Sequence, residues 1–96
     1  MNFAVAITDG AVPRAQRTLK VPHEARLRIE WTADRPLTVH LEGYDISVVV
    51  RPGKLEAMEF KAHASGRFAV HAHEGAQRGK HAHGRGALLW LEVHPK

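Results

Sequence analysis

Residues 66–93 read GRFAVHAHEGAQRGKHAHGRGALLWLEV, and this stretch carries the features that decide the fold. A β-strand with one buried face alternates apolar and polar side chains with a period of two. Such alternation occurs at both ends of the stretch, at Phe68, Val70 and Ala72 and again at Leu89, Leu91 and Val93. The stretch therefore predicts two strands joined by a loop rich in Gly, Lys and Arg.

The rest of the chain repeats this pattern, with a turn signal every eight to twelve residues or so. Alternating segments are expected at residues 3–7, 18–21, 26–31, 37–42, 46–50 and 54–62. In the last of these, Leu55 is out of phase, which predicts a β-bulge, and Met58 belongs to the core. Gly43-Tyr44-Asp45 is expected to form a structural turn. Helix formers gather only at residues 55–60, a run too short to form a stable helix by itself. These features predict an all-β sandwich of about seven or eight strands.

Composition limits the classes of protein that the chain can belong to. Its 96 residues predict one domain, residues 1–96, and its 44% apolar content includes no run long enough to cross a membrane. It begins without the pattern of a secretory signal, so it is either cytosolic or the mature form of an exported protein. The net charge of +4 comes from scattered basic residues without a nucleic-acid-binding motif. We therefore expect neither nucleic acid nor a membrane span.

Eight histidines and no cysteine are the unusual part of this composition. In a strand, the two imidazoles of His-x-His lie on one side, with their Cα atoms about 7 Å apart. Two such triplets, His71/His73 and His81/His83, flank the loop, so four imidazoles from two strand ends are expected to converge. Imidazole binds Cu(II) more tightly than Zn(II) or Ni(II), so Cu(II) is the expected ion and the other two are alternatives. The competing interpretation is a surface loop whose histidines bind nothing.

Other residues of the chain are weaker candidates for metal ligands or catalytic groups. His40 and Glu42 lie on the polar face of their predicted strand and are candidates for the next metal ligand. His23, His63 and His94 are isolated in the sequence and are expected at the surface. Neither serine lies in a Gly-x-Ser-x-Gly context, and a small domain offers little room for a substrate pocket. We therefore predict that the protein is not an enzyme.

Three motifs, in this order, resemble small bacterial domains of the cupredoxin-like family. They are ARLRIEWTADRP at residues 25–36, VHLEGYDI at residues 39–46 followed by Arg51-Pro52-Gly53, and GRFAVHAH…GALLWLEV at residues 66–93. The resemblance covers nearly the whole chain and is strongest to the cysteine-less, His-rich members. It implies a single cupredoxin-like Greek-key β-sandwich, an extracytoplasmic, periplasmic location and a role in copper handling.

The sequence departs from that family pattern at two positions. Glu42 stands where the His-rich members carry a second histidine, and Ala72 stands about where blue-copper proteins carry their cysteine. Without a thiolate ligand, a blue-copper electron carrier is not expected. The sequence therefore predicts storage or delivery of Cu(II), with the ion and a second copper-handling protein as partners. The alternative is an interaction module whose basic loop binds an acidic partner or surface.

Overall fold

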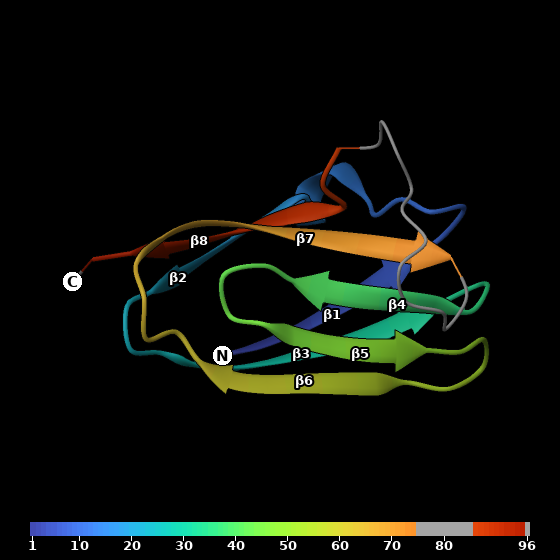
Figure 1. Ribbon diagram of the computed structural model, residues 1–96, viewed down its shortest axis with the longest axis horizontal. Coiled ribbons are helices and arrows are strands. Elements are labelled where there is room, and N and C mark those ends of the chain that lie inside the picture. Colours follow the sequence, from blue (N-terminus) through green and yellow to red (C-terminus); the bar gives the residue numbers. More distant parts are fainter. Residues whose placement is uncertain (75–85, 96) are drawn as a thin grey trace.

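The computed structural model, which describes residues 1–74 and 86–95, is a two-layered β-sandwich (Figure 1). One layer is a three-stranded sheet in the order β1-β3-β6, and the other is a five-stranded sheet in the order β2-β8-β7-β4-β5. The elements are β1 (Asn2–Ile7), the short 3-10 helix η1 (Arg14–Gln16), β2 (Thr18–Pro22), β3 (Arg26–Ala33), β4 (Leu37–Leu41), β5 (Ile46–Val50), β6 (Glu56–Lys61), β7 (Gly66–Glu74) and β8 (Leu89–His94). The predicted all-β sandwich is confirmed.

Strands that are distant in sequence lie side by side in both sheets. β1 pairs with β3 and β2 pairs with β8 in parallel, whereas β4 and β7 are antiparallel neighbours.

Within the described ranges, no helix has the length and hydropathy that crossing a bilayer requires.

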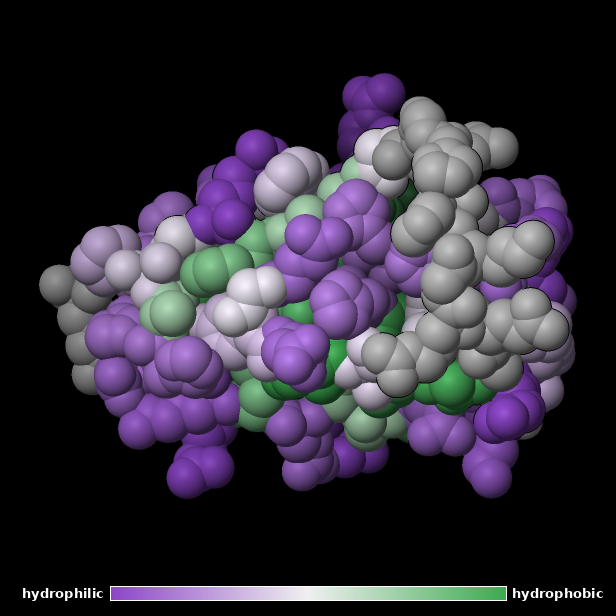
Figure 2. All heavy atoms as spheres, viewed as in Figure 1, coloured by the Kyte–Doolittle hydropathy of each residue, from purple (hydrophilic) through white to green (hydrophobic). Residues whose placement is uncertain are grey.

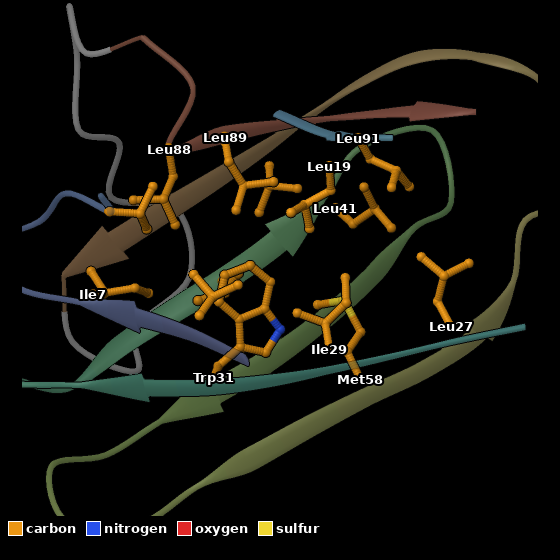
Figure 3. Close-up of a cluster of buried hydrophobic side chains, with 14 of the residues drawn as sticks. Ile7, Leu19, Leu27, Ile29, Trp31, Leu41, Met58, Leu88, Leu89 and Leu91 are labelled. Carbon is orange, nitrogen blue, oxygen red and sulfur yellow. The ribbon is translucent and has the colours of Figure 1, made fainter. Parts of the chain in front are cut away.

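The core lies between the two sheets and consists of the residues that alternate inward (Figure 3). Trp31 from β3 has no exposed surface, and Leu41 and Leu91 from the facing sheet are equally buried. Met58 is 2% exposed, as predicted. Full burial of one such side chain stabilises the fold by about 1.5–3 kcal/mol, so these inward positions account for most of the stability.

The prediction for residues 54–62 was wrong in two details. β6 begins at Glu56, so Leu55 lies before the strand, 47% exposed, and does not form a bulge within it. Ala62 follows the end of β6 but is completely buried, and its amide donates to the Ala25 carbonyl. Leu55 does not follow the alternation of β6 because it directly follows the turn that the bridge between Arg51 and Lys54 closes, and it precedes the first residue of the strand.

The turn after β4 is structural, as predicted, and it depends on Gly43. Gly43 has φ +86°, and a Cβ at this position would lie 2.5 Å from Cδ1 of Phe68. The next residue, Tyr44, packs edge-on against Phe68 with a ring separation of 5.0 Å. Its hydroxyl donates to the Ala64 carbonyl at 2.7 Å and accepts from the Ala64 amide at 3.1 Å. The turn thereby joins β4 to the segment that leads into β7.

An ion cluster ties together three segments at the end of the sandwich where β7 terminates. Arg35 Nη2 lies 3.0 Å from Asp9, its Nη1 lies 3.1 Å from Glu74, and its Nε lies 3.5 Å from Asp34. The Asp9 amide donates to Asp34 at 3.0 Å, and this bond, together with the charge of Arg35, lowers the pKa of the Asp34 carboxyl. Hydrogen bonding to Glu74 and the charge of Asp34 raise the pKa of Arg35.

We expect Gly43→Ala to lower the free energy of unfolding by about 2–5 kcal/mol, measured by urea denaturation. A left-handed φ costs a residue with a Cβ about 1–2 kcal/mol, and overpacking against Phe68 adds about 1–3 kcal/mol. Gly53→Ala is the matched control, because Gly53 has φ +78° but nothing within 4 Å of its Cβ position. Equal losses in the two variants would show that the contact with Phe68 has no energetic role.

The lowered pKa of Asp34 predicts a pH-dependent contribution to stability. Because the folded-state pKa lies below the unfolded value near 3.8, the contribution is present above that value and is lost as pH falls through the folded pKa. In Asp34→Asn we expect melting temperature to fall less steeply than in the wild type below about pH 4. Asp45→Asn is the control, since Asp45 is an exposed turn carboxyl with no hydrogen bond or ion pair to the residues that the structure describes. If the melting temperatures of the two variants fall equally as pH is lowered, the carboxyl of Asp34 contributes no more to acid unfolding than that of Asp45.

Candidate functional site

The predicted ligands on β4 and β7 lie on the outer face of the five-stranded sheet. Because Val39 and Val70 point into the core, the residues after them, His40 and His71, point away from it. The register places His40 directly opposite His71, and the neighbouring pair is Thr38 opposite His73. Figure 1 shows β7, β4 and β5 in front of β1 and β3, so this region is turned toward the viewer.

Polar contacts hold two of these histidines in place. His71 Nε2 lies 3.1 Å from Glu42 Oε2, and the side chains of His71 and Glu42 are 31% and 55% exposed. His40 Nδ1 lies 2.8 Å from Ser47 Oγ on β5. Two separate polar contacts, Glu42–His71 and His40–Ser47, therefore lie on the outer side of β4, β5 and β7.

Ser47 was not among the residues proposed from the sequence. Its role depends on the pairing of β4 with β5, where it stands opposite His40. Local alternation indicates that both residues lie on outward positions, but it does not give the register between the strands.

His73 differs from His40 and His71 in its surroundings. Its Nδ1 is buried and has no hydrogen-bond partner among the residues that the structure describes. The residue lies near the end of β7, one position before Glu74. The other predicted triplet, His81 and His83, lies outside the described residues, so the four-histidine site remains a prediction.

A pocket lies at the same end of the sandwich, on the inner side of the sheet. Apolar Leu37, Ala72 and Leu88 line it together with the charged residues Asp9, Arg17, Arg35 and Glu74. Ala72, which the family resemblance places about where blue-copper proteins carry a cysteine, contributes only a methyl group. The candidate ligands His40, His71 and His73 thus lie on the other face of the sheet.

The three remaining histidines are engaged in local contacts. His23 Nε2 lies 3.0 Å from the His63 carbonyl and 3.3 Å from Glu24, and the His63 ring packs on Tyr44 at 4.7 Å. His94 Nε2 lies 3.4 Å from Glu92. His63 and His94 are exposed, as predicted, whereas His23 is half-buried. His23 and His63 are not isolated, because backbone bonds join their two segments.

Among residues 1–74 and 86–95, no three His, Asp or Glu side chains are grouped closely enough to hold a metal ion as they stand. The outer face offers two histidines in register, a carboxylate in contact with one of them, His71, and a hydroxyl in contact with the other, His40. This arrangement provides nitrogen and oxygen donors suited to borderline divalent ions.

No protein-family model matches the chain. No curated protein matches it either. Solved structures do match in fold. A chain of a heme-copper terminal oxidase dimer superimposes with a TM-score of 0.74 at 22% identity, over 94% of this chain and 60% of its own. The blue copper oxidase from Nitrosomonas europaea gives a TM-score of 0.74 at 22% identity, over 99% of this chain and 39% of its own. A copper binding protein in the apo form gives a TM-score of 0.69 at 11% identity, over 97% of this chain and 86% of its own.

This chain therefore spans only 60% and 39% of the lengths of the two oxidase chains, but most of the length of the copper binding protein. At these identities the likeness concerns the fold. The expectation of a cupredoxin-like sandwich is confirmed by the strand order, by the two facing sheets and by these neighbours. The chain has a cupredoxin-like β-sandwich fold.

Proposed function

We propose that this domain binds a transition-metal ion, Cu(II) in preference to Zn(II) or Ni(II), through His71, His73, His81 and His83. His40 or Glu42 supplies the next ligand. The observation that carries the proposal is that β7 presents both His71 and His73 on its outer face close to its end. The fold itself is shared with proteins named for copper, which supports the choice of ion.

The ligand types favour binding over electron transfer. Imidazole and carboxylate donors without thiolate prefer Cu(II) to Cu(I), and the intense charge-transfer centre of blue copper needs a cysteine. The chain has no cysteine, so storage or delivery of Cu(II) without catalysis is the proposed role. The corresponding location is the bacterial periplasm, where the partner would be a second copper-handling protein.

A Cu(II) titration followed through the histidine side-chain NMR signals tests this function. We expect stoichiometric loss of the signals of His71, His73, His81 and His83 before those of His23 and His63. Because only neutral imidazole is a ligand, binding should weaken strongly as pH falls toward about 5. The double variant His23→Ala/His63→Ala is the control and should bind Cu(II) as the wild type does.

Uniform weak broadening of all histidine signals, or tight binding retained at about pH 5, would contradict an organised histidine site. The function would then be sought in docking of an acidic partner on the basic loop. That interaction weakens steeply with ionic strength, whereas coordination is nearly insensitive to salt.

A further inference from the structure

We propose that Gln16 guards the free edge of β1 and prevents this edge from pairing with the same edge of a second copy of the chain. The side-chain amide of Gln16 donates to the Ala4 carbonyl, with Nε2 at 2.6 Å from the oxygen. The inference is independent of the proposed function, because it concerns the three-stranded sheet and involves none of the proposed metal ligands.

The faces of the sandwich offer little to a second copy. Figure 2 shows hydrophilic side chains gathered over the middle of β4 and β7, in the same view as Figure 1. Among the residues that the structure describes, the large apolar side chains that are exposed are those of Met1 and Leu55. We therefore expect contact between two copies at a strand edge, where the backbone presents amides and carbonyls without partners.

Backbone bonds at the two ends of β1 show which of its groups face β3. The Arg28 amide donates to the Met1 carbonyl, and the Asp34 amide donates to the Ile7 carbonyl. In a parallel pair such bonds recur at every second residue, so the residues in between direct their backbone groups away from the neighbouring strand. The groups on the free edge of β1 are those of Asn2, Ala4 and Ala6.

The sequence of β1 lacks the features that protect the other edge strands. Charged side chains and proline keep edge strands from pairing with other chains. β2 carries the exposed Lys20 and ends at Pro22, which has no amide hydrogen. β6 carries Glu56, Glu59 and Lys61, and it lies beside β5, the edge strand of the other sheet. β1 reads NFAVAI, without charge or proline, so its protection comes from outside the strand.

The free edge of β1 is self-complementary. In a two-fold antiparallel pair centred on Ala4, this residue faces the partner's Ala4, and Asn2 faces the partner's Ala6. Residues that face each other in this way exchange two backbone bonds, with their Cα atoms about 5.5 Å apart. Ala4 and Ala6 are exposed and carry only methyl groups, so their side chains allow two copies to approach to this distance.

Gln16 occupies the central acceptor of that pairing. It is the last residue of η1, and its own backbone amide donates to the Pro13 carbonyl at 2.8 Å. The side-chain bond to Ala4 therefore fastens the segment between β1 and β2 to the edge of β1. A segment that covers an edge is one of the ways in which natural sheets avoid edge-to-edge association. Two copies would have to break one Gln16–Ala4 bond in each chain before they could pair.

Analytical ultracentrifugation of Gln16→Ala over a range of protein concentrations tests the inference. We expect the dimerisation constant to rise about tenfold or more above that of the wild type, because two hydrogen bonds no longer have to be broken. Arg14→Ala is the matched control, since Arg14 belongs to the same helix but its side chain has no hydrogen bond or ion pair with the described residues. Gln16→Ala/Ala6→Lys should return to the wild-type value, because a lysine on the edge strand opposes pairing.

Hydrogen exchange shows whether the contact lies on β1. The amides of Ala4 and Ala6 should exchange without protection in the wild type and become protected when Gln16→Ala associates. An unchanged dimerisation constant in folded Gln16→Ala, or association without protection of these amides, would overturn the inference. Far-ultraviolet circular dichroism checks folding. If Gln16→Ala does not fold, Gln16→Met replaces it, because methionine keeps the length of the side chain without the amide donor.

Discussion

Side chains alternate between the inner and outer faces of the sheet along β7, and this alternation determines both the core and the candidate site. Val70 is 1% exposed and lies opposite Leu41, which has no exposed surface. Burial of this apolar pair fixes the register of β4 against β7. A slip of one residue would turn Val70 to solvent and His71 into the core. The apolar face thus holds His71 in register with His40, and any ligand set on these strands depends on hydrophobic burial rather than on the polar contacts themselves.

The positions of the strands were predictable from the sequence because each depends on local alternation. The segments around Trp31, Val39 and Val70 were identified in this way, and the turn at Gly43 was recognised from its glycine. Local alternation did not predict the contact of His40 with Ser47 or the order of the strands, which only the family resemblance implied. They depend on pairing between segments that alternation does not relate, so the Glu42–His71 contact emerged only in the folded chain.

Because alternation gives only the positions of strands, the structure tests the ligand prediction for β7 but not for the second triplet. His71 and His73 were placed on the outward face by alternation, and the structure confirms that placement. The convergence of four imidazoles was inferred from the matching spacing of the two triplets. The second triplet follows the loop after β7, and the alternation of side chains does not predict where a loop places its residues. His40 and Glu42 were candidate ligands from the sequence, but alternation did not predict their contacts with Ser47 and His71.

The two faces of the sheet at this end differ in their side chains. On the inner side, the pocket combines apolar Leu37, Ala72 and Leu88 with charged residues, and its carboxylates Asp9 and Glu74 are already paired with Arg35. On the outer face, the imidazole of His71 and the carboxylate of Glu42 are partly exposed, so an ion bound there as proposed would exchange water for ligands at small desolvation cost. Because these donors lie on or beside strands whose core faces are already buried, such binding would add to stability through mass action and would not be needed for folding. The sheet would then stay folded when the ion leaves.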